Sequence, residues 1–128
     1  MDEVDFLTID DVQVIHLDQT QRYGGDSSLR DMGLLESAIA QPRAAFADQW
    51  LHAFPFEMAA ACLYHIVQNH PFVDGNKRTD AVTALVFLDL SGIEIHAPQG
   101  ALYDLTIAVA TGQAGKPDIA EFFRQHAV

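Results

Sequence analysis

The chain has little of what several large classes of protein require. It has a single cysteine, Cys62, so it cannot form an internal disulfide, and this excludes the disulfide-rich secreted class. It has 7 lysines and arginines against 18 acidic residues, which argues against binding nucleic acid by neutralising phosphates. Its apolar runs are too short, and too often interrupted by polar residues, to cross a bilayer. We therefore expect no direct nucleic-acid partner and no membrane partner.

Other absences narrow the class further. The acidic start MDEVDFLTIDD is unlike a basic secretory signal, and the chain contains no repeat and no low-complexity linker. Cys62 lies in the apolar run MAAACLYHIV, which predicts a buried and unreactive thiol. At 128 residues, 49% of them hydrophobic, the chain is large enough to bury a core. We expect a single domain over residues 1–128 and a cytoplasmic location.

Capping and stop residues predict an all-α protein. Thr8 precedes the pattern IDDVQVIHLDQTQRY, which has acids in its first turn and Gly24 just past its end, as expected of a first helix. Asp31 can cap a short second helix, MGLLESAIA, that must end near Pro42. Residues 43–54 have no clear period and predict an irregular connection with at most a short hairpin.

The remaining helices are separated by prolines and glycines. Two are apolar enough to be central, namely residues 56–69 after Pro55 and residues 76–91 closed by Gly92. Two shorter helices follow, one from Pro98 to about residue 111 and a last one from Pro117. The segment IEIH alternates and predicts one short extended piece. The prediction is a compact bundle of five to six helices whose two central helices meet at one loop.

That loop, HPFVDGNKRT, carries an unusual concentration of reactive groups. A turn at Asp74 and Gly75 followed at once by a helix directs free backbone N–H groups and the positive end of the helix dipole at the same place. Lys77 and Arg78 then put two cations into the first helical turn. Cations there oppose the helix dipole at a cost of up to ~1 kcal/mol. A bound polyphosphate would offset that cost.

The other groups of the loop complete a chemical set. A carboxylate such as Asp74 beside a phosphate site is the usual means of holding Mg²⁺, which prefers one or two protein oxygens plus phosphate oxygens. A neutral imidazole such as His70 can take a proton from an attacking hydroxyl. Base, metal ligand and anion site in one loop are consistent with phosphoryl or nucleotidyl transfer.

Each residue also has a purely structural alternative. His70 can cap the end of the preceding helix, Asp74 and Gly75 can form an ordinary turn, and Lys77 and Arg78 can be a solvated pair. The joint spacing of these groups favours the functional interpretation. The loop matches neither the glycine-rich Lys-Ser/Thr phosphate loop nor a calcium loop, and no third ligand suggests a zinc site.

The loop resembles the signature of the Fic/Doc superfamily, which runs His-x-Phe-x-Asp/Glu-Gly/Ala-Asn-Gly/Lys-Arg. The flanks LRDMGLLESAIAQPRAAF and TALVFLDLSG are similar to those of the Doc, or death-on-curing, toxins, so that the resemblance covers roughly residues 9–92. The larger Fic branch has glycine at the position of Lys77 and a second arginine at the position of Ala81. Both departures point to the Doc branch.

The resemblance implies a function. Doc proteins are toxins of type II toxin-antitoxin systems that transfer the γ-phosphate of ATP to a hydroxyl of elongation factor Tu and thereby halt translation. In them the lysine matching Lys77 is thought to reverse the orientation of ATP relative to the Fic branch. The resemblance also implies a cognate antitoxin whose C-terminal segment folds into a helix along a groove near the active site. It further implies a flap, here residues 46–54, that aligns the target.

Carried over position by position, the resemblance assigns a role to each loop residue. His70 would be the general base, and Asp74 would hold Mg²⁺. The phosphates would be bound by the backbone of one residue and the side chains of three others: Gly75, Asn76, Lys77 and Arg78. Two alternatives stay open, namely a protein AMP transferase of the Fic type and a catalytically silent module that only binds an antitoxin.

Asp80 does not fit the pattern, because a small apolar residue is expected after Thr79. Its charge suits the first turn of a helix. It would also stand near the phosphate site and could pair with Lys77 three positions earlier. If Asp80 lines that site, replacing it with alanine should tighten nucleotide binding.

Overall fold

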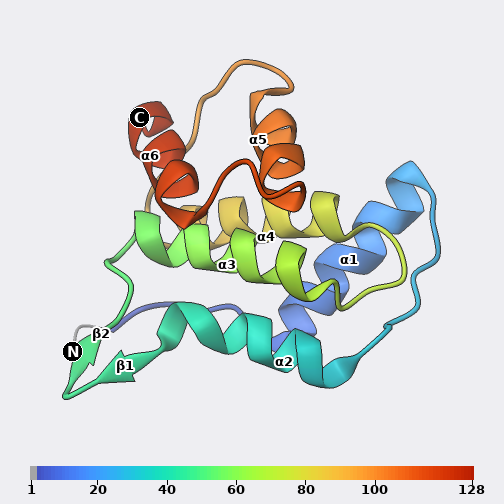
Figure 1. The fold of residues 1–128 in the computed structure, drawn as a ribbon, viewed down its shortest axis with the longest axis horizontal. Helices are drawn as coiled ribbons and strands as arrows, with labels where there is room; N and C mark the ends of the chain where they lie inside the picture. The colour runs from blue at the N-terminus through green and yellow to red at the C-terminus, as the bar shows by residue number, and fades with distance from the viewer. Residues whose placement is uncertain (1–2) are drawn as a thin grey trace.

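A computed structural model describes residues 3–128. Within them the chain forms six α-helices, one short 3-10 turn and a single two-stranded hairpin (Figure 1), which confirms the predicted all-α bundle. The elements are α1 (Ile9–Tyr23), α2 (Met32–Ala40), η1 (Gln41–Arg43), β1 (Ala45–Phe46), β2 (Gln49–Trp50), α3 (Phe56–Asn69), α4 (Asn76–Leu90), α5 (Ala101–Ala110) and α6 (Lys116–His126).

Helix α3 is the centre of the bundle. It packs against α2, α4, α5 and α6, and α1 packs against α4. Figure 1 shows α3 crossing the middle of the molecule, with α2 on one side and α5 and α6 on the other. The side chains that fill the core are fully buried and come from several helices: Leu35, Met58, Leu63, Phe87 and Phe123. The apolar character of residues 56–69 is explained by this central position.

The predicted caps are present. The Thr8 hydroxyl accepts a hydrogen bond from the Asp11 N–H at 3.1 Å, and the Asp11 carboxylate accepts one from the Thr8 N–H at 2.8 Å. The carboxylate of Asp31 accepts a hydrogen bond from the Leu34 N–H at 3.0 Å. These contacts satisfy N–H groups that have no partner inside their own helix, so they set where α1 and α2 begin.

The hairpin lies inside the stretch predicted to be irregular. β1 and β2 pair antiparallel, with Ala45 opposite Trp50 and Phe46 opposite Gln49. The two residues between the strands, Ala47 and Asp48, have φ values of 50° and 60°. This is the tight turn that matches the twist of a hairpin, and it is usually made by Asn or Gly. The structure agrees with the prediction of at most a short hairpin in residues 43–54, and the absence of Asn and Gly explains why the sequence did not give the position of its turn.

One helix boundary and one predicted extended segment differ from the prediction. Helix α5 begins at Ala101 rather than at Pro98, after Gly100 in a left-handed conformation with φ 82°. The IEIH segment forms no strand and makes only an isolated bridge between Ile95 and Ala127. Two backbone hydrogen bonds flank this bridge, from the His96 N–H to the His126 carbonyl at 2.9 Å and from the Val128 N–H to the Glu94 carbonyl at 3.0 Å. A pairing this short does not form a ladder.

Two further findings concern the environment of Cys62 and the apolar character of the helices. Cys62 is buried, and its burial raises the pKa of the thiol to about 12, so the prediction of an unreactive cysteine agrees with the structure. Across residues 3–128, no helix combines the length and the apolar character that crossing a membrane requires.

Candidate active site

All six predicted site residues line one cavity of ≈ 200 Å³ between the end of α3 and the start of α4. Two further residues complete its wall, and the whole lining is His70, Val73, Asp74, Gly75, Asn76, Lys77, Arg78 and Tyr103. The structure therefore brings the predicted base, metal ligand and phosphate-binding groups together. Their individual roles stay predictions.

The turn before α4 has the backbone geometry of an anion site. Gly75 is the N-cap of α4 and is left-handed, with φ 80° and ψ 14°. Its carbonyl accepts a hydrogen bond from the Thr79 N–H at 2.9 Å. Among the described residues, the backbone N–H groups of Gly75, Asn76 and Lys77 have no acceptor. These N–H groups and the helix dipole favour an anion at this end of α4.

Asp74 is exposed and only partly engaged. One of its carboxylate oxygens, Oδ2, accepts a hydrogen bond from the Asp26 N–H at 3.0 Å. Within residues 3–128, no cluster of three acidic, histidine or cysteine side chains is arranged to hold a metal. Mg²⁺ does not need such a cluster, because it is usually bound by one or two carboxylates together with phosphate oxygens and water. An exposed carboxylate beside free N–H donors fits that requirement.

The structure agrees with both the structural and the functional interpretation of His70, because this residue caps the end of α3 and also lines the cavity. It is the C-cap of α3, and it has a left-handed backbone with φ 49° and ψ 57°. That conformation costs a residue with a side chain ~1–2 kcal/mol. Arg30 stabilises it, since the guanidinium donates to the His70 carbonyl at 2.6 Å and to the Asn69 carbonyl at 2.8 Å. A backbone outlier held by its surroundings is common at functional sites.

The connection between α1 and α2 holds the loop in place through backbone hydrogen bonds. The Pro71 carbonyl accepts hydrogen bonds from the N–H groups of Arg30 at 2.7 Å and Asp31 at 3.0 Å. The Val73 N–H donates to the Ser28 carbonyl at 3.1 Å. Sequence reasoning missed this support, because a polar stretch about forty residues from the loop carries no local signal of it.

The side chain of Asn76 has a different contact from the predicted one. Its Oδ1 accepts a hydrogen bond from the Phe72 N–H at 3.0 Å, and its Nδ2 donates to the Phe72 carbonyl at 2.9 Å. Asn76 is only 6% exposed, so both ends of its amide brace the loop. Phosphate binding by this side chain stays a prediction, and its backbone N–H is the group that remains free.

Two aromatic residues near the site were not predicted. Arg78 lies over the ring of Tyr23, at 5.2 Å from its centroid, and this contact helps to orient the guanidinium. Tyr103, from the first turns of α5, forms part of the cavity wall. The C-terminal third carries no motif that points to Tyr103, and only the packing of α5 against α4 brings it here.

Asp80 does not line the cavity, contrary to the hypothesis drawn from its position. It is fully buried, and neither of its carboxylate oxygens has a hydrogen-bond partner among the described residues. The ion pair with Lys77 is also not formed within residues 3–128. Asp80 lies four positions after buried Asn76, on the same face of α4, and that face packs into the core, whereas Lys77 and Arg78 lie on the exposed face.

The fold and the site define a helical protein whose two central helices meet at a loop built to accept an anion. The family model described as "Fic/DOC family" matches residues 6–88, and the chain belongs to that family. A relative named Toxin Doc, from Mycolicibacterium smegmatis, is 40% identical over 77 residues, which are 59% of this chain and 58% of that protein. The chain thus aligns with somewhat more than half of that relative's length.

A second relative is aligned over nearly all of its length. It is named Protein kinase doc, from Escherichia phage P1, and is 32% identical over 120 residues, 93% of each chain. The family predicted from the loop HPFVDGNKRT is therefore confirmed.

Proposed function

We propose that this protein is the toxin of a type II toxin-antitoxin system and transfers the γ-phosphate of ATP to a hydroxyl of a translation factor. Elongation factor Tu is the proposed target, and arrest of protein synthesis in the cytoplasm is the proposed consequence. The observation that carries the proposal is the single cavity lined by His70, Asp74, Gly75, Lys77 and Arg78. The names of the two relatives, a toxin and a protein kinase, support it.

In the proposed reaction His70 takes the proton of the target hydroxyl. The hydroxyl oxygen forms a bond to the γ-phosphorus, the bond from that phosphorus to the β–γ bridging oxygen breaks, and ADP leaves. The backbone N–H groups at Gly75 and the cations of Lys77 and Arg78 bind the phosphates and stabilise the charge that builds up during transfer. Asp74 would hold Mg²⁺, which when bound neutralises phosphate charge.

Transfer of the γ-phosphate is favoured over transfer of AMP by two positions. Lys77 is exposed and lies on the wall of the same cavity as His70, so its side chain takes up room next to the base. Ala81 has no charge to offer where the Fic branch has a second arginine. AMP transfer to a protein hydroxyl remains the alternative reaction.

The hairpin is the proposed contact for the target protein. Phe46 in β1 is 78% exposed, and the two strands form no larger sheet within the described residues. An open strand edge can pair with an extended segment of another protein through backbone hydrogen bonds. The hairpin would thus align a target segment for reaction.

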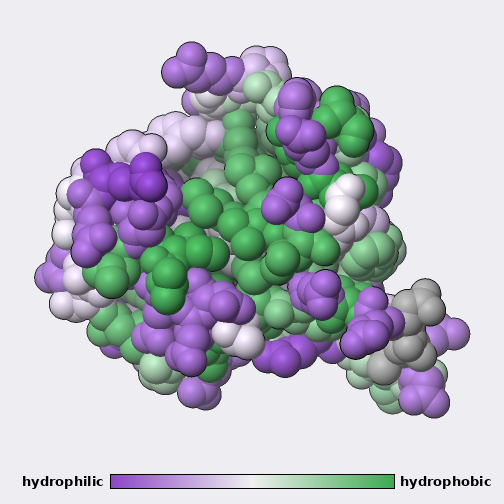
Figure 2. Space-filling model, turned by 180° about the vertical axis from the view of Figure 1, so that it is seen from behind, coloured by the Kyte–Doolittle hydropathy of each residue, from purple (hydrophilic) through white to green (hydrophobic). Residues whose placement is uncertain are grey.

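The proposed antitoxin site is an apolar hollow between α1 and the last turns of α4, at the end of α4 farther from the cavity. Its volume is ≈ 370 Å³, and it is lined by Leu7, Asp11, Val14, Ile15, Val86 and Leu90. Figure 2 shows apolar side chains gathered in the middle of this side of the molecule and polar side chains around them. Val14 is 67% exposed and Leu90 49% exposed. Such a surface suits the apolar side of an amphipathic helix supplied by the antitoxin.

A labelling experiment tests the reaction. The purified protein is incubated with elongation factor Tu, Mg²⁺ and ATP labelled at either the α- or the γ-phosphate, and His70→Ala serves as the blank. We expect γ-label on the factor and none with the variant. Label from the α-position would make the protein an AMP transferase, and absence of both labels would contradict this target and favour the silent antitoxin-binding module.

A further inference from the structure

One buried histidine next to the cavity has no part in the reaction described above. His16, in the middle of α1, is only 2% exposed. Its ring stacks on the Phe72 ring, with centroids 3.7 Å apart and an angle of 10° between the planes. Its Nε2 lies 2.6 Å from the carbonyl oxygen of Asp74. His16 therefore touches the loop at two residues, 56 and 58 positions further along the chain.

The hydrogen bond fixes the direction of one peptide group. A carbonyl oxygen can only accept, so the proton of this bond is on Nε2 of His16. Because a trans peptide is planar, the C=O of Asp74 and the N–H of Gly75 point in opposite directions. Since the carbonyl points toward α1, the Gly75 N–H points away from α1.

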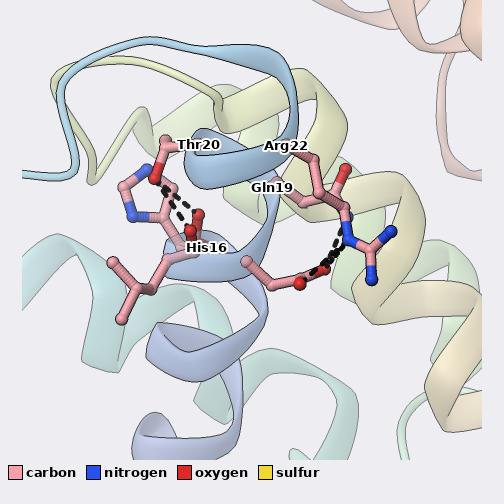
Figure 3. A network of polar contacts seen from close by, with 6 residues as sticks. His16, Gln19, Thr20 and Arg22 are labelled. Carbon is pink, nitrogen blue, oxygen red and sulfur yellow. Dashed lines mark hydrogen bonds and ion pairs between the residues drawn. The ribbon is translucent and has the colours of Figure 1, made fainter.

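Helix α1 packs closely against the turn at Gly75. A Cβ added at Gly75 would lie 3.5 Å from two atoms of the His16 ring and 3.3 Å from the Thr20 methyl group. Figure 3 shows the His16 ring and Thr20 together on one side of the end of α1, and Arg22 on the other side. The Thr20 hydroxyl is bonded within its own helix, to the carbonyls of His16 and Leu17. His16 is thus the residue of this helix surface that donates to the turn.

We propose that His16 is a positioning residue for the phosphate site. Its Nε2–H bond to the Asp74 carbonyl, together with the stack on Phe72, holds the Asp74–Gly75 peptide so that the Gly75 N–H is available to a phosphate oxygen. The inference deepens the proposed function and rests on it only in that the ligand is a phosphate group. If this peptide could rotate freely, its alignment on phosphate binding would cost conformational entropy, and the phosphate would bind more weakly.

Substitutions that distinguish the effect of the His16 ring from the effect of its N–H donor test the proposal. His16→Phe keeps an aromatic ring but removes the donor. His16→Gln and His16→Met form a matched pair of equal length, of which only Gln can donate. Thr20→Val keeps the methyl group against Gly75 and removes a hydroxyl that does not contact the loop, so it is the control on the same surface.

The measurement uses inorganic pyrophosphate with Mg²⁺ as the probe, followed through the backbone amide signal of Gly75 in a proton–nitrogen correlation spectrum. We expect His16→Phe and His16→Met to raise the Kd by about fivefold or more, the effect of losing one ordinary hydrogen bond. The Gln variant should bind more tightly than the Met variant, and Thr20→Val should bind like the unmodified protein. Each spectrum also reports whether the variant is folded.

The possible results separate this proposal from the proposed function. Equal affinities for the Gln and Met variants, or an unchanged Kd for a folded His16→Phe, would overturn the role of His16 even if phosphate transfer is observed. Tight pyrophosphate binding that depends on His16, without transfer to elongation factor Tu, would support His16 and contradict the proposed target. Absence of binding by the unmodified protein would overturn both.

Discussion

At the scale of single residues, the surroundings of Asp80 are unfavourable for an ionised carboxylate. It lies in α4 with no exposed surface, and its two carboxylate oxygens are without a hydrogen-bond partner among the described residues. The hydroxyls of Thr79 and Thr83 on the same helix are likewise unpartnered within residues 3–128. Burial raises the pKa of Asp80 well above its ordinary value, and the Ala81 backbone and the Lys77 charge only partly oppose this. The folded protein therefore favours the protonated carboxyl.

This environment predicts that replacing Asp80 with alanine stabilises the protein. An unfolded aspartate ionises near pH 3.9, whereas the folded one resists ionisation to a much higher pH. Over that interval the unfolded chain binds fewer protons, so stability falls as the pH rises. We expect Asp80→Ala to gain about 1–3 kcal/mol at neutral pH, the cost of an unsatisfied buried polar group, and less near pH 4.

Urea unfolding at several pH values measures this effect. Asp80→Asn, which keeps the shape but cannot ionise, should remove the fall in stability with pH. Asp89→Asn, an exposed acid on the same helix, is the control and should change little. A less stable Asp80→Ala protein at neutral pH would show that the carboxyl has a favourable partner in solution.

At the scale of secondary-structure elements, one lysine joins three segments that are distant in sequence. Lys116, the first residue of α6, lies 3.4 Å from Nε2 of His52, just after the hairpin, and 3.2 Å from Nε2 of His65 in α3. It also lies over the ring of Tyr64, 5.5 Å from its centroid. An ammonium group only donates, so both imidazoles accept and are unprotonated at these nitrogens. Protonating either of them would break its contact with Lys116.

The same cluster predicts a loss of stability in acid. Burial, then Lys116 and then His52 lower the pKa of His65 to about 4. An unfolded histidine titrates near pH 6.5, so below that pH the unfolded chain binds more protons than the folded one. This contribution to stability is complete above about pH 6.5 and is lost as the pH falls toward 4.

Replacing Lys116 with methionine tests the cause. We expect the pKa of His65 to rise in Lys116→Met but to stay below 6.5, since burial is the larger effect. Imidazole proton signals followed by NMR across the pH range give the value, and the unmodified protein measured in the same buffers is the control. Identical titration of His65 in both proteins would contradict the proposed effect of Lys116.

At the scale of the whole molecule, the dominant property is a net charge of −11. An excess of one charge destabilises the compact state through self-repulsion. The candidate site is a local exception, because exposed Lys77 and Arg78 are adjacent there and a phosphate would approach them. Added salt therefore acts in opposite directions on folding and on phosphate binding.

We expect the Tm to rise as NaCl is increased from about 10 mM to about 500 mM, because salt screens the repulsion. Pyrophosphate binding should weaken over the same range. Thermal unfolding and a binding titration in matched buffers measure the two trends, and KCl at equal ionic strength should reproduce both. A Tm that falls with salt would mean that ion pairs outweigh the net repulsion.

The sequence by itself determined the helical elements and the composition of the loop. Thr8 and Asp31 cap helices through residues only three positions away, and Gly75 permits a left-handed turn through its own backbone. Interactions of this range are visible in the order of residues. The loop HPFVDGNKRT was recognisable for the same reason, since its reactive groups are contiguous.

Only the tertiary structure decided what surrounds that loop and which side chains face it. His16 reaches Asp74 across 58 positions and Arg30 reaches His70 across 40, and Tyr103 joins the cavity because α5 packs against α4. Asp80 points into the core rather than toward the phosphates, because the face of α4 that carries Asn76 and Asp80 is the one that packs against the other helices. No local pattern encodes such contacts, since they exist only once distant segments have been brought together by burial of the core they share.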